Sequence, residues 1–304
     1  MPTVTSGVQT VTATINGQTY NLTYNSTSGK WEATITAPST SSYNNNAGHY
    51  YPVTLTATDV AGNSVSANDQ HSTLGNSLKL KVKETTAPTV SNVSPSNNSY
   101  LATSTPTITA ELRDNDSGVD ISTLSLKIDN VAVSSGITTS QVSGGYNISY
   151  TPASALADGA HTIKIKVSDN DGNESTEASV TINIATTAPT LTITSPADNL
   201  ATKTSSLTVS GTTNTDATVT VKLNSGSAQS VTVGSGGAFS KTITLSTEGE
   251  NTITIVATNP AGVTTTVTRT VIYDITAPVF QSIVINPNPA TTGNTYTITV
   301  EVTD

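Results

Sequence analysis

The chain has 304 residues, of which 34% are hydrophobic, 4% aromatic and 11% charged, and it contains no cysteine. Globular proteins average roughly 45–50% apolar and roughly 25% charged residues, which argues against one large core here and, since charge is so low, against ordinary disorder. The missing cysteine excludes disulfides, thiolate metal sites and thiol nucleophiles, and the net charge of -9 disfavours nucleic acid and anionic membranes as partners.

The residue pattern along the chain is that of β-strands. Threonine makes up about a fifth of the sequence, and β-branched residues suit a pleated, half-buried surface. Apolar residues recur with a period of two, and no stretch has a sustained helical period. No segment reaches the roughly 18 apolar residues of a membrane span, and the first ten residues lack the basic and apolar regions of a secretory signal. Met1 is thus either an added residue or the start of a protein displayed without a signal.

A Thr-Ala-Pro tripeptide recurs at residues 86–88, 187–189 and 276–278, each time between two strand-like runs. The spacing is close to the length of one β-sandwich domain, and proline at a strand start suits a short linker. We therefore predict four segments. They are module 1 (1–86, divergent and aromatic-rich), module 2 (87–186), module 3 (187–275) and the first two strands of a truncated fourth module (276–304).

Modules 2 and 3 read as six and seven strands separated by turn signals. The expected strands lie near 89–94, 106–113, 123–129, 145–151, 160–168 and 177–185, and near 190–194, 206–212, 217–223, 228–233, 238–245, 250–258 and 263–273. Alternation within each run predicts one buried face, as in two packed antiparallel sheets. Late in each of modules 1 to 3 two alternating runs flank a glycine-containing turn, which predicts a hairpin.

The two ends of the chain have opposite deficits. Residues 277–304 match only the opening strands of module 2, and roughly 28 residues cannot bury a core alone. Module 1 aligns better with the middle of the other modules than with their starts. Two interpretations stay open: a divergent module with an arbitrary chain end, or strand donation between chains that gives head-to-tail self-association through edge strands.

Several segments resemble tandem bacterial immunoglobulin-like domains of the Big and cadherin-like type. The resemblance lies in TAPT (86–89), DSGVD (116–120), LADGAHTIKIKVSDNDGN (156–173) and NTITIVATNPAG (251–262). Such domains occur in surface adhesins and in virion proteins, and residues 17–38 and 49–64 are similar to proteins of Firmicutes phages and prophages. The resemblance implies an all-β chain of tandem immunoglobulin-like β-sandwich modules in an elongated array, and an extracellular location on a bacterial surface or a phage virion.

Catalysis finds little support in the sequence. The three histidines (His49, His71 and His161) lie in loops or at a strand end, and no nucleophile elbow, phosphate loop or zinc-binding histidine pair is present. Glycoside hydrolysis needs two carboxylates in a walled cleft, which sandwiches this poor in aromatic residues rarely build. We therefore predict that the protein is not an enzyme.

Calcium is the better chemical candidate. Module 2 carries acidic residues in its second-strand loop and its last hairpin loop, which lie at the same end of a sandwich as the incoming linker. The candidate ligands are Glu84, Asp114, Asp116, Asp120, Asp169 and Asp171. Crowded carboxylates repel one another unless a hard cation or distance relieves them, so a calcium ion here would stiffen the joint between modules 1 and 2. The alternative is that these residues only form turns, as Asp and Asn commonly do.

The aromatic residues concentrate in module 1, which holds the one tryptophan and five of the ten tyrosines. Aromatic faces and Asn amides are typical of shallow surfaces that hold sugars or protein loops. The candidate ligand-binding residues are Trp31, Tyr43, Tyr50 and Tyr51. The alternative is that they fill the core of a small module.

Two classes of function remain. One is adhesion or recognition, with a cell-surface glycan, a protein or neighbouring virion proteins as partners. The other is a purely structural spacer or stalk of a cell-surface protein or a virion appendage. A third interpretation, an accessory region of a polysaccharide-degrading enzyme, predicts a catalytic domain beyond Asp304. Neither nucleic-acid binding nor membrane insertion is expected.

Overall fold

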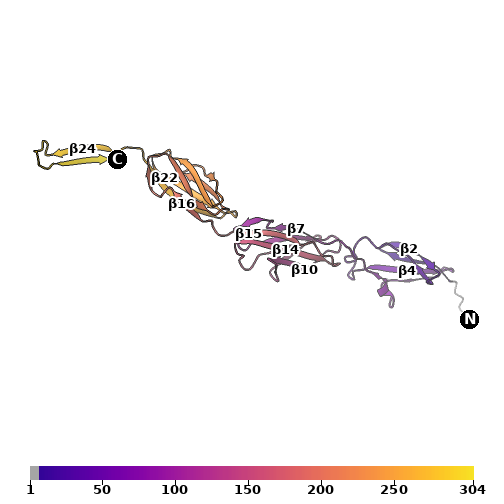
Figure 1. Ribbon diagram of the computed structural model, residues 1–304. Coiled ribbons are helices and arrows are strands. Elements are labelled where there is room, and N and C mark those ends of the chain that lie inside the picture. The colour runs from indigo at the N-terminus through magenta and orange to yellow at the C-terminus, as the bar shows by residue number, and fades with distance from the viewer. Residues whose placement is uncertain (1–6) are drawn as a thin grey trace. The chain divides into compact units, whose positions relative to one another are not determined.

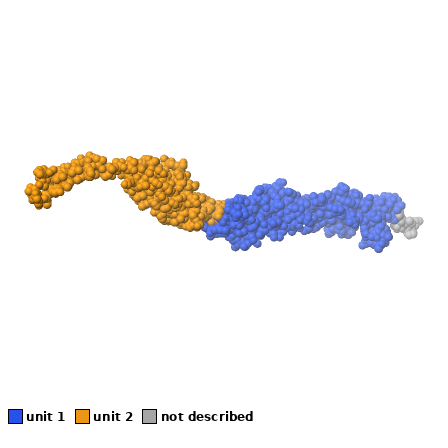
Figure 2. Space-filling model, turned by 45° about the horizontal axis from the view of Figure 1, so that its top comes forward, with its two compact units in different colours: residues 1–99, 104–183 blue, residues 100–103, 184–304 orange. Residues whose placement is uncertain are grey.

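The computed structural model describes residues 7–304. The chain divides into two compact units, residues 1–99 with 104–183 and residues 100–103 with 184–304 (Figure 2). In the described part of the chain the only helix is the short 3₁₀ segment η1 (Gly75–Leu78), and the other regular elements are β-strands. The predicted all-β class is therefore confirmed.

Module 1 forms one antiparallel sheet in the order β3-β2-β1-β4-β5, with β6 paired to β4 (Figure 1). Its strands are β1 (Val8–Ile15), β2 (Gln18–Asn25), β3 (Lys30–Glu32), β4 (Tyr51–Asp59), β5 (Ser64–Ala67) and β6 (Lys79–Leu80). Val11 lies opposite Leu22 on one side and Ala57 on the other, which gives an apolar row across the sheet. The core is small, because the buried hydrophobic side chains described in this module are Ala13, Tyr51 and Leu78.

Module 2 is a sandwich of two sheets. Its strands are β7 (Thr89–Ser94), β8 (Ser99–Leu101), β9 (Ile108–Arg113), β10 (Val119–Ile128), β11 (Val131–Ala132), β12 (Thr138–Val142), β13 (Gly145–Tyr150), β14 (Gly159–Asp169) and β15 (Ala178–Ile184). One sheet has the order β12-β13-β9-β7, and the other contains β11-β10-β14-β15 (Figure 1). Because side chains alternate along each strand, β9 buries Leu112 and β14 buries Ile163 and Ile165 between the sheets.

Module 3 repeats this plan. Its strands are β16 (Leu191–Ser195), β17 (Leu200–Thr202), β18 (Ser206–Thr213), β19 (Thr218–Leu223), β20 (Gln229–Val231), β21 (Ala238–Thr244), β22 (Gly249–Thr258) and β23 (Thr264–Tyr273). The sheets are β16-β18-β21 and β17-β23-β22-β19-β20. Val209 and Phe239 from the first sheet and Ile255 from the second belong to one buried hydrophobic cluster. Two sheets around one apolar interior define a β-sandwich, as the sequence predicted.

The last described element is a hairpin of β24 (Val279–Asn286) and β25 (Thr297–Thr303). Both strands expose apolar side chains, among them Phe280, which is 67% exposed. β24 pairs with β25 as β7 pairs with β9 and as β16 pairs with β18. In module 1, β1 pairs with β2 and β4 as β19 pairs with β20 and β22. The hairpin is therefore paired like the opening strands of modules 2 and 3, and the strands of module 1 are paired like middle strands of module 3. Head-to-tail self-association between chains stays a prediction.

His161 at the start of β14 lies in a short polar network. Its Nδ1 is 2.6 Å from Oδ2 of Asp129, and its Nε2 is 2.9 Å from the carbonyl oxygen of Ala157. Burial alone would lower the pKa of His161, but these two acceptors outweigh it and raise the pKa above its ordinary value. Burial alone would raise the pKa of Asp129, but hydrogen bonds from His161 and the Thr162 N–H, with the His161 charge, lower it. Both groups therefore favour the charged pair.

We expect the His161–Asp129 pair to make the stability of module 2 depend on pH. A raised histidine pKa contributes stability that is complete below about pH 6.5 and lost as pH rises through the folded-state value, and the aspartate contribution is lost as pH falls below about 4. Because Asp129 is 47% exposed, the effect is about 1 kcal/mol or less. Denaturant unfolding of His161→Gln should lack the loss of stability that begins above about pH 6.5, whereas His71→Gln should keep it. An unchanged loss in His161→Gln would contradict this assignment.

Candidate functional site

The linker between modules 1 and 2 is held by the last hairpin loop of module 2. The backbone N–H of Glu84 donates to Oδ2 of Asp171 at 3.0 Å, and Lys83 Nζ donates to the Asp171 carbonyl oxygen at 2.7 Å. Asn173 Nδ2 donates to the Glu84 carbonyl oxygen at 3.2 Å. The chain therefore enters module 2 along a series of polar contacts.

A second set of contacts comes from the loop of residues 39–50 in module 1. The N–H of Ser41 donates to both carboxylate oxygens of Asp116, at 2.9 and 3.0 Å. Asn44 Nδ2 donates to the carbonyl oxygens of Asp116 and Ser117. Ser41 and Ser42 are buried. The long polar loop of module 1 therefore contacts the second-strand loop of module 2.

Two aspartates shape the module 2 loops that make these contacts. Asp114 Oδ1 accepts from the N–H groups of Asp116 and Gly118, at 3.0 and 2.7 Å. Asp169 Oδ1 accepts from the N–H groups of Asp171 and Asn173, at 2.9 and 2.8 Å. Both side chains thus act as turn formers, which Asp does by accepting from N–H groups further along the chain.

Glu84, Asp114 and Asp169 form what we call the acidic cluster. One carboxylate oxygen of each lies within 4.8 Å of the others, and Asp114 and Asp169 are buried. Two full charges at this separation repel by roughly 3 kcal/mol at an effective dielectric constant of 20. Burial raises the pKa of Glu84, and the charges of Asp114 and Asp116 raise it further, against the hydrogen bonding by Ser117. The charged form of the Glu84 carboxylate in the linker is therefore disfavoured by its surroundings.

The six predicted metal ligands separate into three groups. The acidic cluster brings three of them together, whereas Asp116 and Asp171 lie at the same joint and accept hydrogen bonds from module 1. Asp120 is used in a turn of its own, where Oδ1 accepts from Ser122 N–H and Oγ–H. Hydroxyl and amide residues are too common in this chain to stand out in the sequence, so four polar residues of the joint were not predicted: Ser41, Asn44, Ser117 and Asn173.

The four predicted ligand-binding aromatics do not share one surface environment. Tyr51 is buried, at 4% exposure, and its hydroxyl bonds Thr40 at 2.6 Å. Trp31 lies in β3 with its ring 5.7 Å from that of Tyr24. Tyr43 stacks on His49 at 4.1 Å, and Tyr50 donates to Asp69 at 2.7 Å. Ligand binding by these residues stays a prediction.

The linker entry to module 3 has the same backbone hydrogen bonds as the entry to module 2, but neutral residues take the place of the acidic ones. Asn259 Oδ1 accepts from the N–H groups of Ala261 and Val263, as Asp169 does two and four residues along its own loop. Its Nδ2 donates to the carbonyl oxygens of Ala185 and Thr187, both at 3.0 Å. Module 3 therefore fixes its linker with an amide.

The other two cluster positions also have neutral counterparts in module 3. The N–H of Thr213 donates to Gly237 as that of Asp114 donates to Gly144, and both side chains are buried. Ala185 precedes Thr-Thr-Ala-Pro as Glu84 does. The three positions that are acidic at the entry to module 2 are thus Ala, Thr and Asn at the entry to module 3.

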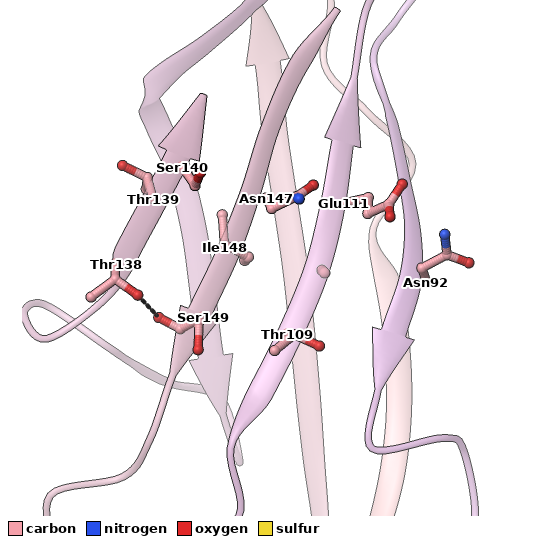
Figure 3. Close-up of a pocket in the computed structure, with 10 residues that line it drawn as sticks. Asn92, Thr109, Glu111, Thr138, Thr139, Ser140, Asn147, Ile148 and Ser149 are labelled. Carbon is pink, nitrogen blue, oxygen red and sulfur yellow. Dashed lines mark hydrogen bonds between the residues drawn. The ribbon is translucent and has the colours of Figure 1, made fainter. Parts of the chain in front are cut away.

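A shallow depression of about 380 Å³ lies on the outer face of the β12-β13-β9-β7 sheet (Figure 3). Side chains from all four strands line it, including Asn92 on β7, Glu111 on β9 and Asn147 on β13. None of its ten lining residues is aromatic, so it lacks the flat apolar faces on which sugar rings stack. It is the weaker candidate site.

Two stretches of the chain match family models. Residues 88–165 match the Bacterial Ig domain, and residues 189–275 match Glucodextranase, domain B. Each match covers less than half of the chain. Together with the sandwich folds they support tandem immunoglobulin-like modules, a class that is generally non-catalytic and, in bacteria, typically extracellular or surface-exposed. No curated protein matches the sequence.

Solved structures similar to this chain are distant in sequence. Fibronectin(III)-like modules of CbhA from Clostridium thermocellum are 17% identical, with 61% of this chain and 94% of theirs covered and a TM-score of 0.39. A three-domain immunoglobulin segment of titin is 13% identical, with 90% and 89% covered and a TM-score of 0.41. An intimin structure is 18% identical, with 62% and 99% covered and a TM-score of 0.30. In the described residues, no helix has the length and apolarity to cross a bilayer.

Proposed function

We propose that this chain is a non-catalytic spacer segment of an extracellular modular protein, carried on a bacterial cell surface or on a phage particle. Immunoglobulin-like folds host spacers and binding modules alike, so the choice between them has to come from particular surfaces. The observation that carries the proposal is the use of the loop of residues 39–50 in module 1. Its Ser41 and Asn44 bond to Asp116 and Ser117 of module 2, so the loop joins two modules.

Recognition of a glycan or protein is the second candidate. A cavity of about 450 Å³ beside this joint favours it, because its lining includes Tyr43, Asn44, Gln141, Tyr146 and Asn170. Aromatic rings and amides are suited to sugars. A glycan array and a pull-down with the full chain separate the candidates. Binding that Tyr43→Ala with Tyr146→Ala removes would replace the spacer proposal with recognition, and no binding leaves the spacer.

A distance measurement across the joint tests the spacer proposal directly. The chain has no cysteine, so Asn21→Cys on β2 and Thr139→Cys on β12, both exposed, accept spin labels without background. We expect a narrow distance distribution in chelator, because the contacts of Asp116 fix module 1 against module 2. Asp116→Ala should broaden it, since Ser41 N–H loses its acceptor, and Asp120→Ala should leave it narrow. A distribution that is already broad in the unsubstituted chain would contradict the proposal.

A further inference from the structure

We infer that the acidic cluster, with the hydroxyl of Ser117, binds one divalent cation of the calcium type and fastens the linker to module 2. This inference stands whether the chain is a spacer or a recognition protein, because it concerns the joint itself. Hard cations take carboxylate, hydroxyl, carbonyl and water oxygens. The joint brings such oxygens together from the linker and from both module 2 loops.

Two of the three carboxylates have an oxygen to spare for a cation, and in the third, Asp169, Oδ2 accepts a single hydrogen bond, from Asn173 Nδ2 at 2.7 Å. Both turn bonds to Asp114 go to Oδ1, so its Oδ2 accepts no hydrogen bond from the described residues. Glu84 accepts the Ser117 N–H on Oε1 at 2.7 Å, and its Oε2 likewise accepts none from the described residues. The turns therefore use only part of the cluster's capacity, and turn formation and cation binding are compatible.

Ser117 is an independent sign that a partner belongs at this point. The residue is 1% exposed, and its Oγ is buried without a hydrogen bond in the described structure. The backbone N–H of the same residue donates to Oε1 of Glu84 at 2.7 Å, so Ser117 lies directly against the cluster. A buried hydroxyl without a partner is costly, and coordination by its oxygen would remove that cost.

No positive side chain of the described residues neutralises the cluster. Its three carboxylates take part in none of the ion pairs found among residues 7–304. The nearby Lys83 directs its Nζ to the carbonyl oxygen of Asp171. A bound divalent cation would supply the charge that the protein itself does not.

Module 3 provides an internal comparison that separates turn formation from charge. Asn259 makes the same two turn bonds as Asp169 without a carboxylate, so the turn does not require an acid. The counterparts of Glu84 and Asp114 are Ala185 and Thr213, which are also neutral. Acids at all three of these positions in one joint, and at none of the three in the other, therefore call for an explanation other than loop geometry.

Calcium fits these ligands better than magnesium does. Calcium accepts six to eight oxygens in flexible geometry, whereas magnesium requires a near-octahedral set and gives up water reluctantly. Carboxylates from three separate segments, with a hydroxyl, make an irregular set that waters can complete. An affinity of about 10⁻⁴–10⁻³ M, that of extracellular calcium modules, is expected.

Isothermal titration of the full chain with calcium chloride tests the inference. We expect one ion per chain and an upward shift in the melting midpoint that excess chelator reverses. The decisive variant combines Glu84→Ala, Asp114→Thr and Asp169→Asn, which are the residues that module 3 uses in the same backbone setting and should therefore fold. In this triple variant, both the heat of calcium binding and the calcium-dependent shift of the melting midpoint should be lost. Asp120→Asn, which removes a carboxylate from the same module outside the cluster, should bind as the unsubstituted chain does.

Three outcomes would overturn the inference. In the first, the unsubstituted chain shows neither a heat of calcium binding nor a shift in its melting midpoint. In the second, the triple variant still binds calcium. In the third, Asp120→Asn abolishes calcium binding. Circular dichroism of the triple variant distinguishes a lost site from a lost fold. If the triple variant does not fold, Ser117→Ala gives the second reading, because it keeps every turn bond and should weaken calcium binding several-fold.

Discussion

Replacing Ile255 by alanine is expected to lower the free energy of unfolding of module 3 by about 2–5 kcal/mol. Ile255 is 0% exposed on β22, between Val221 of β19 and Val267 of β23. It belongs to the cluster that also holds Phe239 from the facing sheet, so alanine would leave a cavity that both sheets line. A module with so few large side chains has little other apolar volume with which to fill that space.

Two control variants separate the cavity from other effects of the substitution. Ile255→Val removes one methylene and should cost about 0.5–1.5 kcal/mol. Ile272 lies on the neighbouring strand β23 and is 41% exposed. Ile272→Ala should therefore lower the free energy of unfolding by much less than Ile255→Ala does. Calorimetry of the full chain measures all three variants. A loss for Ile255→Ala no larger than that for Ile272→Ala would contradict the assigned core.

Asn259→Asp is the second substitution for which a large loss is expected. Asp keeps the oxygen that accepts from the loop N–H groups, but it replaces the amide that donates to Ala185 and Thr187. A carboxylate would then face two carbonyl oxygens at a position that is 8% exposed. Two lost hydrogen bonds and unpaired acceptors predict a loss of about 2–4 kcal/mol in module 3.

The reciprocal substitution Asp169→Asn is the matched control. It retains the oxygen that accepts from the backbone N–H groups of Asp171 and Asn173, removes one charge from the acidic cluster, and loses the hydrogen bond from Asn173 Nδ2 to Oδ2. In chelator its loss of stability in module 2 should be well below that of Asn259→Asp in module 3, because relief of the repulsion among three crowded carboxylates offsets the one lost hydrogen bond. Denaturant unfolding of both variants gives the comparison. Equal losses in the two modules would mean that the loop position, and not the charge of its side chain, governs stability.

The strands of the sandwiches could be predicted from the sequence wherever they were long enough to show the two-residue alternation of apolar and polar side chains. The alternation over 160–168 predicted β14, whose residues alternate between half-buried and buried positions from Thr162 to Asp169. Two- and three-residue strands such as β11 and β17 were missed, because so short a run has no measurable period. The edge strand β12 was missed as well, since its exposed polar sequence Thr138–Val142 has no apolar face to detect.

The candidate site could be predicted only in part. The topology of a sandwich was enough to bring Glu84, Asp114 and Asp169 to one end of module 2. Sequence could not separate Asp120 from them, because its place in a turn depends on the exact course of the loop. Nor could it reveal that the loop of residues 39–50 contacts module 2, since that contact depends on how the two modules pack.

The central claim is that each sandwich folds around an interior of its own, so that function resides in surfaces and joints. Hydrogen exchange measured by mass spectrometry on Ile255→Ala and on the unsubstituted chain tests it most directly. Loss of a separate core should accelerate exchange in the strands of residues 191–273 and leave residues 89–183 as protected as before. Faster exchange in both regions would mean that they share one cooperative core, and it would contradict this account.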